Sequence, residues 1–164
     1  MVNFATFGLL IASLIATASA APAPVAEAEA APVSPSFTPL EHEARAMINN
    51  CGASTFINQS SPGSPFVSDC RQIATNIAGG GTWSVALIGH HQLVQYGTCA
   101  FGVQAPFALG VTNFRVGNSD IIDLINDSIS RFEWSGRVGA KGNMPCQTDP
   151  GMFNIDVEWG IYHD

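Results

Sequence analysis

"YGTCAFGVQ", residues 96–104, places a cysteine at the start of an alternating apolar run. Cys99, Phe101 and Val103 share one parity, and Val94 and Tyr96 share the other. Gly97 lies where the apolar alternation changes from one parity to the other, which predicts a bulge or a tight bend there. Because successive strand residues point to opposite faces, Cys99 is expected to face the core.

The chain begins with a stretch typical of a secretory signal peptide. An apolar run too short to span a bilayer is followed by Ala18-Ser19-Ala20, which predicts cleavage after residue 20. Residues 21–50 are rich in Ala, Pro and Glu, which predicts a disordered leader or pro-segment. Residues 51–164 have the composition of one compact domain and contain no apolar run long enough for a transmembrane helix. We therefore expect a secreted, extracellular protein.

The four cysteines all lie in residues 51–164, and their spacing matches neither a CxxC redox pair nor a zinc site. An even number in a small secreted domain predicts two disulfides. Cys70 shares the apolar face of a predicted helix and Cys99 that of a strand, so a Cys70–Cys99 bridge is favoured, leaving Cys51 to pair with Cys146. Three pairings are possible from the sequence alone. A disulfide also explains Cys99 better than a catalytic thiol does.

Periodicity predicts two helices and several strands. The helices cover residues 70–78 and 118–132, whose apolar residues recur at helical spacing. Strands are expected over 82–88, 92–104, 137–141 and 153–163, with a turn near Gly89 that includes His90 and His91, and a loop-like stretch at 105–117. The predicted fold class is α+β: a two-layer sandwich of four to five antiparallel or mixed strands, with two helices packed on one face.

The candidate catalytic groups are few and scattered. His90, His91 and His163 could serve as bases, and Asp156 and Glu158 share the polar face of the last strand. A solvated turn explains the first two histidines equally well, and a soluble outer face explains the carboxylates. No pattern indicates a metal, and "NIAGGGTW" (residues 76–83) lacks the lysine of a phosphate loop. We expect no cofactor and no catalytic residue.

The charge of residues 51–164 limits the kinds of partner that the domain is expected to bind. In residues 51–164 the carboxylates outnumber the basic side chains nine to five, so nucleic acid is an improbable partner. Asn58 and Asn126 begin glycosylation sequons; Asn58 is the better candidate because it lies in a loop, whereas Asn126 lies in a predicted helix. The expected partner is a protein or membrane component of a host or a competing microbe, bound by a monomer.

Several stretches together resemble one family. They are "CGASTFINQSSPGSPFVSDCRQIATNIAGGGTW", "YGTCAFGVQ", "VGNSDIIDLINDSISRF", "GRVGAKGNMPC" and the closing "VEWGIYHD". In this order they resemble the necrosis-inducing factor family of fungal effectors, built around extracellular protein two of a leaf-mould pathogen. The family is distantly similar to KP-type killer toxins, and some members are fused to chitinase-like modules.

The resemblance implies a secreted virulence factor that acts on plant tissue by binding and is not an enzyme. One alternative is a killer-toxin-like antimicrobial protein acting on membranes or channels of other microbes, although such proteins are usually basic and this domain is acidic. A small secreted hydrolase, such as a ribonuclease, is less favoured because its acid–base groups are not clustered in the sequence.

Overall fold

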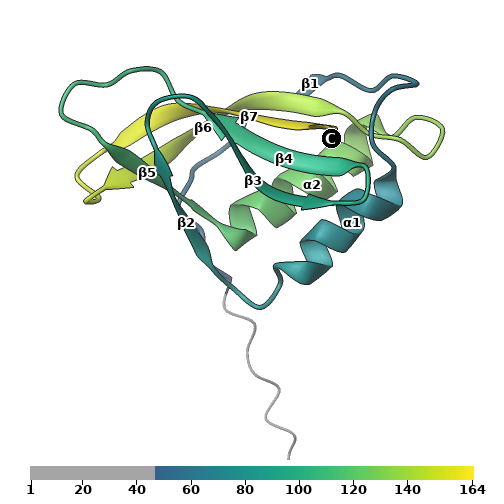
Figure 1. Ribbon diagram of the computed structural model, residues 1–164, viewed down its shortest axis with the longest axis horizontal. Helices are drawn as coiled ribbons and strands as arrows, with labels where there is room; N and C mark the ends of the chain where they lie inside the picture. The colour runs from purple at the N-terminus through teal and green to yellow at the C-terminus, as the bar shows by residue number, and fades with distance from the viewer. Residues whose placement is uncertain (1–46) are drawn as a thin grey trace, which may run out of the picture. The chain divides into compact units, whose positions relative to one another are not determined.

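The computed structural model describes residues 47–164 (Figure 1), so the predicted signal peptide (1–20) and residues 21–46 of the predicted leader lie outside the described residues. In order, the elements are β1 (Ile57–Asn58), α1 (Val67–Asn76), β2 (Thr82–Ala86), β3 (His90–Tyr96), β4 (Cys99–Gln104), β5 (Asn113–Gly117), α2 (Asn118–Phe132), β6 (Ala140–Asp149) and β7 (Asn154–His163). None of the helices in this part of the chain is long and apolar enough to cross a membrane.

All seven strands belong to one antiparallel sheet with the order β2-β5-β6-β7-β4-β3, and β1 pairs with β6. The edge strands β2 and β3 follow each other in the chain and are joined only by residues 87–89. A connection this short brings the two edges of the sheet toward each other, so the sheet curves into a nearly closed, barrel-like form. The predicted sandwich of four to five strands is therefore wrong.

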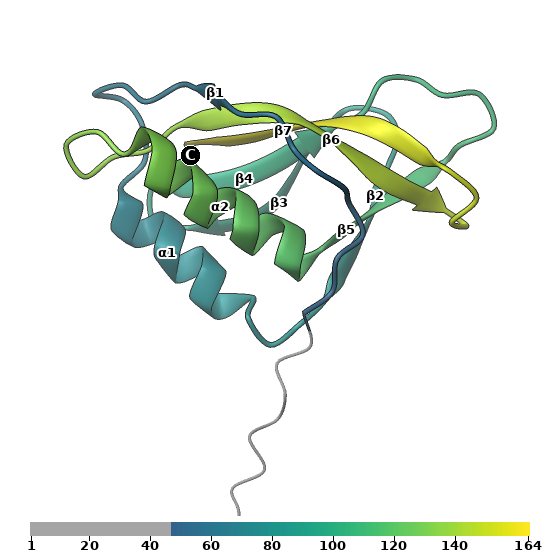
Figure 2. The same ribbon diagram turned by 180° about the vertical axis from the view of Figure 1, so that it is seen from behind.

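The two helices lie side by side beneath the curved sheet in both views (Figures 1 and 2). On α2 an apolar stripe that includes Ile121, Leu124, Ile125 and Ile129 is buried, as its helical spacing predicts. On α1 the buried residues are Val67, Cys70 and Ile73. These stripes meet the inward residues of the strands, among which Phe101, Phe114 and Trp159 are almost fully buried.

Several elements differ from those expected from the sequence. His90 and His91 begin β3 and do not form a turn, because the turn is completed before them at Gly89. The stretch expected to be loop-like contains β5. The strand expected over 137–141 instead runs over Ala140–Asp149. Every second residue of this strand is buried, but most of the buried residues are small or polar, so the sequence shows no hydrophobic alternation there. Helix α2 has its predicted bounds, whereas α1 begins and ends earlier than the helix predicted over 70–78. The strand predicted over 92–104 is divided into β3 and β4, and the other predicted strands occur with shifted ends.

Two disulfides hold the domain: Cys70–Cys99, across 29 residues, and Cys51–Cys146, across 95. They are the pairs that the sequence favours. The first joins α1 to β4, and both of its cysteines are fully buried, so Cys99 is an inward residue and not an exposed nucleophile. The second fastens the chain ahead of β1 to β6.

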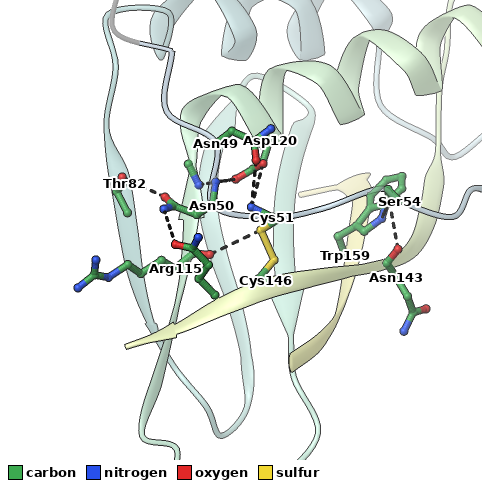
Figure 3. Close-up of a disulfide and its surroundings, with 12 residues drawn as sticks. Asn49, Asn50, Cys51, Ser54, Thr82, Arg115, Asp120, Asn143, Cys146 and Trp159 are labelled. Carbon is green, nitrogen blue, oxygen red and sulfur yellow. Dashed lines mark hydrogen bonds between the residues drawn. A yellow bond between two sulfur atoms is a disulfide. The ribbon is translucent and has the colours of Figure 1, made fainter. Parts of the chain in front are cut away.

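The segment from Asn50 to Gln59 runs along β6, and Figure 3 shows its first residues beside Cys146. Its last residue, Gln59, lines the groove described below. Its backbone amides at Gly52, Thr55 and Gln59 donate to the carbonyls of Pro145, Asn143 and Gly139. The amides of Asn50 and Cys51 donate to the buried carboxylate of Asp120 at 2.9 and 3.3 Å. Residues 48–50, assigned above to the leader, are thus bonded to the domain.

Candidate functional site

The outer face of the sheet carries a groove of about 280 Å³. It crosses β3, β4, β7 and β6, because the outward residues of these neighbouring strands surround it. The side chains that line it come from Gln59, His90, Gln104, Lys141, Glu158 and Tyr162, and the backbone at Gly102 and Gly160 forms part of its wall.

Two aromatic rings meet over a glycine at one side of this outer-face groove. The rings of His90 and Tyr162 lie 5.4 Å apart, centre to centre, at 60° to each other. A Cβ at Gly102 would lie 2.7 Å from the His90 ring and 2.8 Å from the Tyr162 hydroxyl. The rings can occupy these positions because residue 102 has no side chain.

The Tyr162 hydroxyl is positioned by Gln92 on β3. It donates a hydrogen bond to the Gln92 side-chain oxygen at 3.0 Å. Burial, with a smaller contribution from the negative charge of Asp164, raises the pKa of Tyr162 above its ordinary value of 10.0. The hydroxyl therefore stays protonated at neutral pH and can act as a hydrogen-bond donor or acceptor.

The polar wall of the groove follows from strand register. His90 lies opposite Gln104 on β4, and Gln104 lies opposite Glu158 on β7. Outward residues in one such row share a face, so a histidine, an amide and a carboxylate stand side by side. Lys141 lies opposite Gly160, next to this row. The groove thus offers one cation, one anion, amide groups and aromatic faces to a ligand.

Of the predicted acid–base residues, the structure brings only His90 and Glu158 to the groove. Asp156 lies further along β7 and accepts a hydrogen bond from the Asn143 amide at 2.8 Å. His91 is out of phase with His90 in β3, and its Nε2 lies 2.9 Å from the Ile88 carbonyl oxygen. His163 is at the other end of β7, opposite Cys99.

Sequence reasoning missed most of the groove. Gln59, Gln104 and Lys141 carry no motif, and they come together through pairings between strands distant in sequence. One local signal was available. Gly102 interrupts the alternating run of β4, and a glycine inside a strand often marks a close approach by another group.

A second hollow, of about 320 Å³, lies between the segment 49–56 and α2. Asp120, Asp123 and Asp127 line it, but the Asp120 carboxylate is already occupied by backbone amides. In the described part of the chain, no group of three or more His, Cys, Asp or Glu side chains could hold a metal ion.

The two glycosylation sequons differ in accessibility. Asn58 is exposed on β1, whereas Asn126 is exposed on α2 but is followed by Ser128, whose hydroxyl is buried. Because that hydroxyl is part of the recognised sequon, the folded domain presents Asn58 better. Glycosylation of either residue stays a prediction.

Comparison with known proteins gives the chain its family. Residues 50–146 match the model of the Hce2 family, described as pathogen effectors and candidate necrosis-inducing factors. Two relatives named as chitinases come from Penicillium expansum. "Probable chitinase LysM18" is 40% identical over 70% of this chain, and "Secreted chitinase LysM12" is 30% identical over 66%. The matches cover only 8% and 7% of those proteins, so the chain spans a small part of their length. With its matching motifs and its two disulfides, the chain belongs to the Hce2 family of pathogen effectors.

Proposed function

We propose that this chain is a secreted effector that acts on host plant tissue, inducing necrosis, and that it acts by binding rather than by catalysis. Family membership supports an effector role, and the two disulfides suit an extracellular protein. The observation that carries the proposal of binding is the groove over Gly102, with its paired rings and mixed polar wall.

The arrangement of the groove favours binding over acid–base catalysis. A catalytic histidine is usually oriented by a hydrogen-bonded carboxylate. His90 instead contacts the Tyr162 ring, and Glu158 lies two strands away, a backbone separation of about 10 Å. Rings and amides held on rigid strands are well suited to orienting a bound ligand.

We propose an oligosaccharide as the ligand. The relatives are named chitinases, and a binding module that holds the substrate would suit such proteins. The groove offers aromatic faces for sugar rings, and its amides, Lys141 and Glu158 can bond hydroxyl and acetamido groups. Chitin fragments carry both kinds of group.

Titration calorimetry with chitin tetrasaccharide tests this ligand. We expect binding by the wild-type protein and binding at least about tenfold weaker for Tyr162→Ala, since one buried ring contact and one hydroxyl are lost. Tyr96→Ala is the matched control, because Tyr96 is also a strand tyrosine but lies outside the groove. Equal affinity of the two variants would show that the ligand does not bind in the groove.

The effector role is tested by infiltrating purified mature protein into leaves and adding it in parallel to yeast, fungal and bacterial cultures. Leaf necrosis without growth inhibition is the expected result. Growth inhibition at low concentration with no plant response would favour the killer-toxin alternative. Hydrolysis of RNA that is lost in His90→Ala would favour a hydrolase.

A further inference from the structure

Three loops extend from one end of the sheet. Ala86 of β2, Asn113 of β5 and Asp149 of β6 pair in a single row. The loops 87–89, 105–112 and 150–153 adjoin this row, and the Leu87 amide donates to the Thr112 carbonyl at 2.9 Å. Figures 1 and 2 show the second and third of these loops projecting at the same end of the molecule.

Large apolar side chains stand almost fully in solvent on these loops. Ile88 is 78% exposed, Phe107 76%, Leu109 89% and Met152 79%, and Phe153 is about half exposed. The first four are the most exposed large apolar side chains in residues 47–164. Exposed apolar groups gathered at one place usually mark an interaction surface.

The three loops carry no charged side chain. The nearest charges in the row, Asp149 and the neighbouring Arg115, form an ion pair with each other at 2.6 Å. No lysine or arginine is therefore available on the loops to attract anionic lipid headgroups, and the acidic balance of the domain opposes such attraction.

We propose that these loop tips insert into the interface of a neutral, zwitterionic lipid bilayer. The apolar side chains stand on separate projecting loops, and lipid can surround each tip. A protein partner would need a surface complementary to all three at once. Apolar contact drives the association, so it depends weakly on salt and on anionic lipid.

Co-sedimentation of the mature protein with phosphatidylcholine vesicles tests this inference. We expect binding by the wild type, and binding at least about tenfold weaker for the double variant Phe107→Ser/Leu109→Ser, because two large apolar groups no longer enter the interface. The matched control is Tyr96→Ser, which removes a half-exposed aromatic ring at the opposite end of β3. Circular dichroism establishes that each variant is folded.

The outcomes separate this inference from the proposed groove function. Tyr162→Ala should bind vesicles as the wild type does, because the groove is not part of the loop tips. Lack of sedimentation with phosphatidylcholine, equal binding by the double variant, or binding only when phosphatidylserine is added would each overturn the inference. If the wild type does not bind vesicles and the double variant loses leaf activity, the loop tips bind a protein partner instead. That result would also overturn the inference.

Discussion

Asp120 is the residue that anchors the beginning of the domain. Its carboxylate accepts the amides of Gly117 at 2.7 Å, Asn50 at 2.9 Å and Cys51 at 3.3 Å (Figure 3 shows the last two). Burial raises the pKa of Asp120 above its ordinary value of 3.8, and the three amides offset this only in part. The same carboxylate therefore organises both the N-terminus of α2 and the Cys51–Cys146 disulfide.

We expect Asp120→Asn to lower the free energy of unfolding at neutral pH by about 1–3 kcal/mol, because an amide has one acceptor oxygen for three donors. The raised pKa means that folding favours the protonated form of Asp120. This contribution to stability is fully present below pH 3.8, the ordinary pKa, and is lost as the pH rises through the pKa of the folded state. Urea unfolding at several pH values measures both effects. Asp123→Asn, on the exposed side of α2, is the control; equal stabilities of the two variants would contradict the anchoring role.

At the scale of single residues, the sequence predicts burial better than it predicts partners. The alternation of "CAFGVQ" correctly predicts an inward Cys99, because strand periodicity is a local property. His90 and Glu158 could be named as candidates but not brought together, since their shared face depends on the register of β3, β4 and β7. Register is fixed by contacts across the whole sheet, so no short stretch records it.

At the scale of elements, the β3–β4 hairpin is tied to the start of α1. The Asp69 carboxylate accepts the Thr98 amide and hydroxyl, both at 2.8 Å, next to the Cys70–Cys99 disulfide. Gly97 has a positive φ of 55°, and a Cβ there would lie 2.5 Å from the Asp69 carboxylate. The predicted bend at Gly97 is therefore the tight turn of a hairpin, and the glycine lets the helix approach it.

Asp69 should make this attachment sensitive to acid. Its hydrogen bonds from the Thr98 amide and then the Thr98 hydroxyl hold the pKa of Asp69 below 3.8. The stability it contributes is present above the ordinary pKa and is lost as pH falls through the lowered one. We expect Asp69→Asn to have a lower Tm than the wild type at neutral pH and the gap to close as the pH falls through the lowered pKa. A gap that stays constant across this range would contradict the assignment.

The elements differ in how clearly their sequences reveal them. Strand β7 and helix α2 are predictable because large apolar residues, such as Trp159 and Ile125, recur at the inward positions of β7 and along one stripe of α2. Strand β6 has an equally regular burial pattern, but its inward residues include Ala140, Gly142 and Thr148. Small and polar residues give no hydrophobic alternation, so most of β6 escaped prediction.

At the scale of the whole molecule, the two disulfides constrain unequal lengths of chain. Cys51–Cys146 spans 95 residues and Cys70–Cys99 spans 29. The loss of unfolded-state entropy grows with loop length, so removal should cost about 4–5 kcal/mol for the first and about 3–4 kcal/mol for the second. Thermal unfolding of Cys51→Ala/Cys146→Ala and Cys70→Ala/Cys99→Ala measures the order. A larger loss in the second double variant would contradict the entropic account.

Closure of the sheet is also a property of the whole molecule. It follows from the pairing of β2 with β5 and of β3 with β4, which makes two consecutive strands the opposite edges of one sheet. The sequence reveals both strands but not their neighbours, so a flat two-layer sandwich was the simpler expectation. The outer-face groove depends on this topology, because its walls come from four strands.

If the effector acts by binding at the outer-face groove, leaf infiltration with a matched pair of glycine variants should reveal it. A methyl group in Gly102→Ala would displace the His90 and Tyr162 rings, whereas a Cβ at Gly79 would meet nothing within 4 Å. We expect the dose of Gly102→Ala that causes necrosis to rise at least about tenfold, and that of Gly79→Ala to equal the wild-type dose. Equal potency of all three folded proteins would contradict binding at the groove.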